Sequence, residues 1–235
     1  MSTQAAELHT HHRDVTGGWL RPAVFGVMDG LVSNAALLAG VVGSGASAPA
    51  VAVAGLAGLA AGAFSMATGE YTSVASQREL TLAEIDVERG EISRNPEAEK
   101  RELALVYESR GLTPELADQV AGQLHRDPEV AWRVHAREEL GVDPDDLPSP
   151  WVAAGSSFLA FAIGALIPVL PFLLGLPSVA VSTGLTGLAL FGTGALVARL
   201  TRRSPLFGGA RQLGLGAAAA AVTYGIGALM GAAIS

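Results

Sequence analysis

The sequence contains no cysteine, and charged residues make up only 16% of its 235 positions. A chain without cysteine forms no disulfide, builds no zinc–thiolate site and has no thiol nucleophile. We also find no nucleophile triad, no phosphate-binding loop and no cleavable secretory signal. These absences lead us to expect that the protein is not an enzyme and is not secreted.

Apolar residues and glycine dominate the chain instead, at 50% hydrophobic residues and 29 glycines. Five segments are each long enough to cross the ~30 Å hydrocarbon core of a bilayer as a helix. They cover residues 19–42, 49–71, 151–174, 179–199 and 206–234. We therefore expect an all-α polytopic membrane protein with five transmembrane helices and a cytoplasmic helical module between spans two and three. The expected domains are a disordered N-terminal tail with three histidines (1–18), transmembrane helices 1–2 (19–71), the acidic helical module (72–148) and transmembrane helices 3–5 (149–235).

Charge is concentrated in the module. Nineteen of the 22 acidic residues, but only nine of the 15 basic ones, lie between residues 70 and 148, which gives that segment a formal charge of −10. Such a surface disfavours nucleic acid as a partner and favours multivalent cations. Arginines flank the first span and follow the fourth, so the positive-inside rule places the N-terminus and the module in the cytoplasm. Five spans then place the C-terminus outside.

Proline and glycine mark the helices of the module. Asn95, Thr113 and Asp127 each precede a proline, a pattern that predicts three helix starts, and Gly111 and Gly141 predict helix ends. No proline or glycine interrupts residues 71–89, so the second span is expected to continue into the cytoplasm as one long helix. In the membrane, Pro168 and Pro171 are expected to kink the third span. Pairs of glycines four residues apart predict close helix packing in the second and fifth spans, at Gly58, Gly62, Gly227 and Gly231.

Asp29 is the only charged residue in about thirty apolar and small residues. A carboxylate at that depth costs on the order of 2.5–3.5 kcal/mol, so we interpret it as a functional residue. It can exchange a proton for a divalent cation, and Met66 offers a soft ligand or fills a gap in the core. Ser33 and Asn34 supply either oxygen ligands or helix–helix hydrogen bonds. Glu70, at the end of the second span, either lines an entrance or is an ordinary interfacial charge.

Paired glutamates in the module predict a metal site. Glu88 and Glu91 share one helix face, Glu99 and Glu102 repeat the spacing on the next helix, and the turn between them is short. Four converging carboxylates repel one another unless cations neutralise them, although solvated glutamates are also common on helices. His135 and Glu139 share a face of the last helix. An imidazole beside carboxylates shifts the preference towards Fe²⁺ or Mn²⁺.

Several motifs together resemble the vacuolar iron transporter family, known from plants, fungi and prokaryotes. They are FGVMDGLVSNAALLAG around Asp29, SMATGEYTSVASQREL from Ser65, the paired glutamates, EELG at the end of the last module helix and GALIPVLPFLL from Gly164. The similarity covers nearly the whole chain, and we take the protein for a prokaryotic member in the inner (plasma) membrane. The resemblance implies a homodimer of five-span subunits that exports Fe²⁺ from the cytosol in exchange for protons.

The resemblance also assigns residues. It puts the intramembrane pathway on Asp29 and Met66, and the cytoplasmic metal-binding carboxylates on Glu88, Glu91, Glu99, Glu102 and Glu139. Members of the family can have a methionine pair just before the last of these glutamates, where this chain has His135 and Ala136. We expect no permanently bound cofactor, Fe²⁺ or Mn²⁺ as the transported ion, and the lipid bilayer, protons and a second copy of the chain as partners.

Two other functions remain open from the sequence. Paired carboxylates on adjacent helices also describe di-iron oxidases, so a membrane-anchored ferroxidase or iron store is one alternative. Such proteins usually carry Glu-x-x-His pairs, which the module lacks. A metal sensor is the other alternative, and it leaves Asp29 and Met66 without a role.

Overall fold

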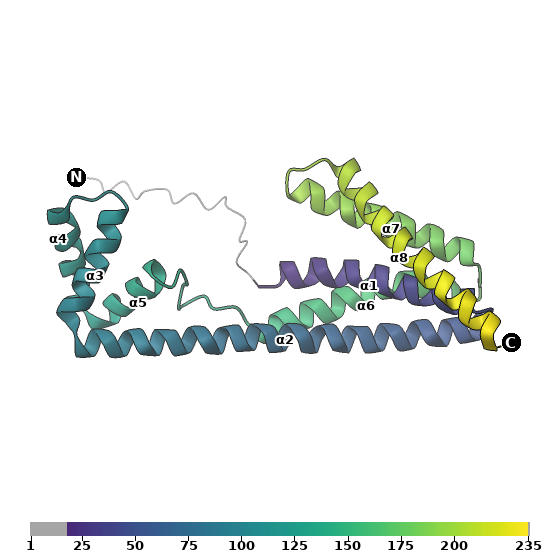
Figure 1. Cartoon of the computed structure of the whole chain (residues 1–235), viewed down its shortest axis with the longest axis horizontal. Coiled ribbons are helices and arrows are strands. Elements are labelled where there is room, and N and C mark those ends of the chain that lie inside the picture. The colour runs from purple at the N-terminus through teal and green to yellow at the C-terminus, as the bar shows by residue number, and fades with distance from the viewer. Residues whose placement is uncertain (1–17, 235) are drawn as a thin grey trace, which may run out of the picture. The chain divides into compact units, whose positions relative to one another are not determined.

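The computed structural model describes residues 18–234, and every regular element within that range is an α-helix. The three histidines of the expected tail lie outside the described residues. The helices are α1 (Leu20–Gly43), α2 (Ala48–Arg94), α3 (Pro96–Ser109), α4 (Pro114–Leu124), α5 (Pro128–Glu138), α6 (Pro150–Leu173), α7 (Val179–Leu200) and α8 (Pro205–Ile234), drawn in Figure 1. The all-α prediction is confirmed, including the helical insertion between spans two and three.

The chain forms two compact units. Of the described residues, the membrane unit contains those up to Thr72 together with those from Pro150 onward, and the acidic unit contains Ser73–Ser149. The long helix α2 contributes its apolar first half to the membrane unit and its charged second half to the acidic unit.

Five helices, α1, α2, α6, α7 and α8, are long and apolar enough to cross a membrane. Large apolar side chains cover their outer surfaces: Trp151, Leu188 and Leu229 are 73%, 73% and 75% exposed. Such exposure is unfavourable in water but not in lipid, where the solvent is itself apolar. The five predicted spans are confirmed as elements, and the protein is a multi-pass membrane protein.

Within the membrane unit, α1 packs on α6 and α8. Helices α7 and α8 pack on each other as a hairpin (Figure 1). The predicted glycine pairs serve this packing inside one chain. Gly58 and Gly62 of α2 face side chains of α1 and α6, whereas Gly227 faces the backbone of Gly40 in α1 and Gly231 that of its C-terminal cap. Side chains on these glycines would separate the helices, so the pairs are accounted for without a second subunit.

Helix α6 runs through Pro168 and Pro171 without a break. The carbonyl oxygen of Pro168 accepts a hydrogen bond of 2.6 Å from Ser182 Oγ, which ties α7 to α6.

The acidic unit begins and ends its helices where proline and glycine predict. Asn95 occupies the N-terminal cap of α3, although its side chain makes no capping hydrogen bond. Asp127 caps α5 with its side chain, which accepts a 2.9 Å hydrogen bond from the Glu129 backbone N–H. Gly111 and Gly141 adopt φ values of +101° and +67°, in the left-handed region that glycine enters without strain.

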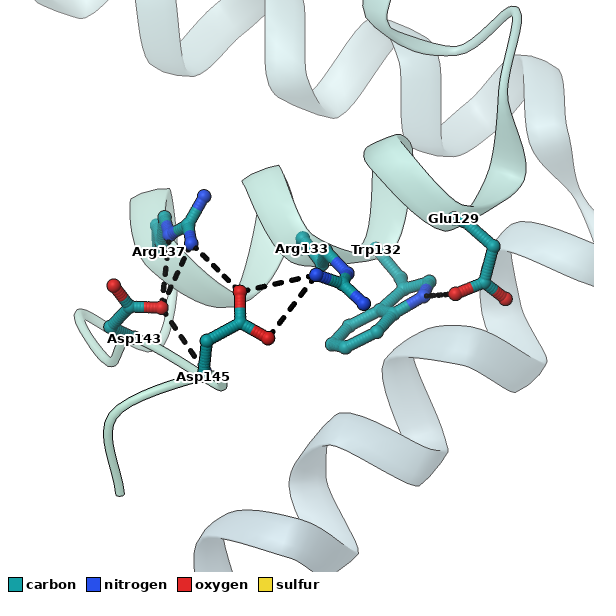
Figure 2. Close-up of polar contacts among 6 residues, drawn as sticks. All are labelled: Glu129, Trp132, Arg133, Arg137, Asp143 and Asp145. Atoms are coloured by element: carbon teal, nitrogen blue, oxygen red, sulfur yellow. Dashed lines mark hydrogen bonds and ion pairs between the residues drawn. The ribbon is translucent and has the colours of Figure 1, made fainter. Parts of the chain in front are cut away.

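An ion-pair network ties the segment after α5 back onto that helix (Figure 2). Arg137 Nη2 lies 2.8 Å from Asp143 Oδ1, and Arg133 Nη1 lies 3.1 Å from Asp145 Oδ2. Trp132, between this network and α2, donates a 3.0 Å hydrogen bond to Glu129. Exposed ion pairs are worth roughly 1 kcal/mol or less each, so the network determines the path of the segment more than the stability of the unit.

Candidate metal sites

One group of possible metal ligands lies in the interior of the acidic unit. His135 of α5 has a fully buried side chain, and its Nδ1 lies 2.9 Å from Glu88 Oε1 and 2.7 Å from Glu139 Oε1. Despite these short distances, neither contact has the direction of an N–H···O hydrogen bond. Both Nδ1 and Glu88 Oε1 are buried without a hydrogen-bond partner. Two of the three converging atoms are thus buried without a partner, and the third belongs to the exposed Glu139.

This arrangement fits a transition-metal ion. The three ligand atoms lie within 4.8 Å of one another. Nitrogen and carboxylate ligands bind such ions at about 2.0–2.2 Å, which brings neighbouring ligand atoms to roughly 3 Å from each other. One imidazole with two carboxylates suits Fe²⁺ and Mn²⁺ among the first-row ions.

A second group shares Glu88. Its other members are Glu91 on α2 and Glu99 on α3, and again their ligand atoms lie within 4.8 Å of one another. Glu88 and Glu99 are buried, at 7% and 8% exposure, while Glu91 is exposed. Glu102 is exposed and belongs to neither group, but its charge acts on the other carboxylates. The structure thus brings the predicted ligands into two groups that meet at Glu88, and their role in metal binding stays a prediction.

Burial shifts the pKa values of this cluster strongly. It raises the pKa of Glu88 to about 7, and the neighbouring charges of Glu99, Glu91 and Glu102 act in the same direction. Burial and the nearby carboxylates, Glu88 first, likewise raise the pKa of Glu139 to about 7. Burial lowers the pKa of His135 to about 4, helped by His125. Near neutral pH Glu88 and Glu139 therefore titrate, so each can exchange a proton for a cation, beside an imidazole that is already neutral.

The raised pKa values predict that the metal-free acidic unit loses stability as pH rises. A carboxyl group with a higher pKa when folded stabilises the fold at low pH, and this contribution disappears as pH rises through the folded-state value. The lowered pKa of His135 has the opposite effect and makes stability increase with pH, but only below the unfolded-state pKa of 6.5. Between about pH 6.5 and about pH 8 the two glutamates therefore dominate, and opening of α5 should become easier.

Amide hydrogen exchange of α5 in the chelator-treated, full-length protein measures this effect. After correction for the intrinsic pH dependence of exchange, the protection of the α5 amides should be lower at about pH 8 than at about pH 6.5. The double variant Glu88→Gln/Glu139→Gln should show no such fall. Protection that is constant or rises with pH in the wild type would contradict the assignment.

The membrane unit contains a cavity of about 270 Å³ lined by four of the predicted pathway residues: Asp29, Ser33, Asn34 and Met66. Its walls are completed by Leu37, Gly58, Gly62, Ser65 and Phe161. Gly58 keeps the cavity open, because a Cβ there would lie 2.7 Å from Asn34 Oδ1. Glu70, predicted as a further pathway residue, is not part of this lining.

Ser33 and Asn34 use their donor groups for hydrogen bonds to the backbone. Ser33 Oγ donates to the Asp29 carbonyl oxygen at 2.6 Å, a bond within α1. Asn34 Nδ2 donates to the carbonyl oxygens of Gly55 (3.2 Å) and Ala165 (2.7 Å), and so joins α1 to α2 and α6. These two bonds orient the amide, and its Oδ1 remains buried without a partner. Both residues thus donate to backbone, and the Asn34 oxygen remains free to accept from or ligate an occupant of the cavity.

One residue of the acidic cluster was missed by sequence reasoning. His125, the C-terminal cap of α4, places its Nε2 2.9 Å from Nε2 of His135. The nine residues between the two histidines include a turn and a helix start, so no helical periodicity predicts that they meet. Burial, followed by the charge of Lys100, lowers the pKa of His125.

The fold describes a polytopic helical membrane protein with two groups of side chains that could hold a metal ion. The chain belongs to the VIT family, whose sequence profile matches residues 20–228. It is 39% identical over 222 residues to a vacuolar iron transporter of Acanthamoeba castellanii, covering 91% of this chain and 79% of that protein. Vacuolar iron transporter 1 of Oryza sativa subsp. japonica is 32% identical over 228 residues, and the alignment covers 94% and 90% of the two chains.

Vacuolar iron transporter 1 of Arabidopsis thaliana is likewise 32% identical, over 219 residues that cover 92% of this chain and 88% of the relative. The predicted family is therefore confirmed. These relatives are named as transporters and not as enzymes, in agreement with the prediction that the chain is not an enzyme.

Proposed function

We propose that this protein exports Fe²⁺ from the cytosol, with Mn²⁺ as a second cargo, in exchange for protons. The observation that carries the proposal is the convergence of Glu88, His135 and Glu139 in a VIT-family membrane protein. The relatives' names identify iron as the ion. The cavity between α1 and α2 supplies an intramembrane carboxylate and a thioether.

The acidic unit captures the ion. Glu88 and Glu139 exchange their protons for the cation, and Nδ1 of His135 completes a mixed nitrogen and oxygen ligand set. Glu91 and Glu99, with Glu88, hold a further ion, and Glu102 adds negative charge nearby.

Asp29 carries out the transport step. Its carboxylate binds either a proton or a divalent cation, which is the minimal requirement for coupling the two in opposite directions. Met66 contributes a soft thioether that favours Fe²⁺ over Mg²⁺ and Ca²⁺, and Asn34 Oδ1 adds a neutral oxygen. In this proposal the protein acts as a homodimer in the plasma membrane.

Fe²⁺ flux tests the function. The purified full-length protein is reconstituted into liposomes that contain a dye quenched by Fe²⁺, and Fe²⁺ is added outside. The protein should quench the dye faster than protein-free liposomes do, and more so when the vesicle interior is acidic. Quenching no faster than in protein-free liposomes would contradict export, and oxygen consumption with Fe²⁺ but without flux would favour a ferroxidase.

The proposed orientation leads to a separate prediction. Reporter fusions after residue 145 and after residue 235 should lie on opposite sides of the membrane, the first in the cytoplasm. The physical reason is a cluster of arginines, with Arg199 in the last turn of α7 and Arg202 and Arg203 in the loop before α8, which the positive-inside rule keeps in the cytoplasm. Two reporters on the same side would contradict five spans in this orientation.

A further inference from the structure

The contact between His125 and His135 contains a single hydrogen. Their Nε2 atoms lie 2.9 Å apart in hydrogen-bonding geometry, so one ring donates an N–H and the other accepts with its lone pair. The two rings meet edge to face, with centroids 5.1 Å apart. His135 is fully buried, so its Nε2 depends on this neighbour for a partner.

The surroundings of the other edge of the His135 ring favour one of the two tautomers. If His125 donated, neutral His135 would carry its own proton on Nδ1, facing Glu88 and Glu139. Nδ1 makes no hydrogen bond to either carboxylate, although both oxygens are within 3 Å. With the proton on Nε2 of His135 and donated to Nε2 of His125, the lone pair of Nδ1 is left among the carboxylate oxygens, where a cation can bind it.

We propose that His125 is a positioning residue of the metal site, which accepts the Nε2–H of His135 and thereby holds that imidazole in its metal-binding tautomer. This inference rests on the proposed function, because it takes the Glu88–His135–Glu139 group as the site of a divalent transition-metal ion. Metal-binding histidines generally donate their second N–H to an acceptor that determines tautomer and ring orientation, and here the acceptor is another imidazole. His125 is not itself a ligand of this ion, since it contacts the edge of His135 that faces away from the carboxylates.

Two substitutions distinguish the role of His125 as a hydrogen-bond acceptor from its role in filling space beside His135. His125→Gln keeps an acceptor oxygen near the position of the ring Nε2, whereas His125→Leu fills similar space without an acceptor. The leucine variant should weaken Co²⁺ binding by the full-length protein by about 10–100-fold, and the glutamine variant should bind nearly as well as wild type. Equal loss in both variants would overturn the inference.

A spectroscopic signature of the hydrogen bond provides a second readout. In the Co²⁺ complex of the wild type, proton NMR should show one strongly shifted, exchangeable N–H signal, from Nε2 of His135. His125→Gln should retain this signal, and His125→Leu should lose it through exchange with water. Two such signals in the wild type would make His125 a ligand of the metal. A signal that persists in His125→Leu would show that the hydrogen bond is not needed. Either result would overturn the inference.

His135→Ala separates failure of this inference from failure of the proposed function. If the wild type binds Co²⁺ no better than His135→Ala, the metal site itself is wrong and the inference falls with it. If His135→Ala weakens binding but His125→Leu does not, only the role of His125 is wrong.

Discussion

Replacing Asp29 by asparagine is expected to reduce metal transport to the level of protein-free liposomes, with metal binding by the acidic unit unchanged. Asparagine preserves the size of the side chain and its hydrogen bonding, but it cannot cycle between a proton and a cation. Among the described residues, Asp29 is the only ionisable side chain in the lining of this cavity, so no other residue of the lining can exchange a proton for a cation. Dye quenching measures transport, and calorimetry with Mn²⁺ on the same detergent-solubilised protein measures binding.

Two variants control this experiment. Asp86→Asn makes the same chemical change at an exposed residue that pairs with Arg89 at 3.7 Å, and it should transport like the wild type. Met66→Leu keeps the shape of the cavity wall and removes only the sulfur, so it should weaken transport and alter the order of metal preference. Wild-type flux in Asp29→Asn would remove the intramembrane carboxylate from the mechanism.

Replacing Glu88 by glutamine is expected to have the largest effect on metal binding. Glu88 belongs to both ligand groups, so one substitution removes a carboxylate from each. The amide also leaves Nδ1 of His135 facing a weaker ligand. We expect affinity for Mn²⁺ to fall by at least about 100-fold, more than the 10–100-fold typical of partners outside the ligand shell.

Glu84→Gln is the matched control, since Glu84 lies one helical turn earlier on α2 and is exposed. It should bind Mn²⁺ like the wild type. Calorimetry of the full-length protein compares the two variants, and a Glu88→Gln variant with wild-type affinity would contradict the assignment of both ligand groups.

Local sequence signals were sufficient to predict the helices. The prolines after Asn95, Thr113 and Asp127 each occupy the first turn of a helix, a position that proline favours. The glycines at 111 and 141 allow the left-handed turns that end helices. The five apolar runs predict membrane helices because an isolated backbone in lipid must satisfy its own hydrogen bonds. These features depend on neighbouring residues only, so they could be predicted without knowledge of the tertiary fold.

Which residues meet at each site depends on how separate helices pack against one another. The sequence could therefore predict the members of each site only in part. Spacing places Glu99 and Glu102 on one face of α3, but only Glu99 is buried and close to Glu88. The contact of His125 with His135 depends on the packing of α4 against α5, which no periodicity encodes. Asn34 likewise gains its two backbone acceptors from other helices.

The central claim, that metal and protons move in opposite directions through the Asp29 cavity, is tested most directly by recording both ions in the same vesicles. Proteoliposomes carry one dye quenched by Fe²⁺ and a second that reports internal pH. The account predicts that added Fe²⁺ enters the wild-type vesicles while their interior becomes alkaline with the same time course, and that both signals are absent in Asp29→Asn. Fe²⁺ uptake by the wild type without any accompanying exit of protons would contradict it.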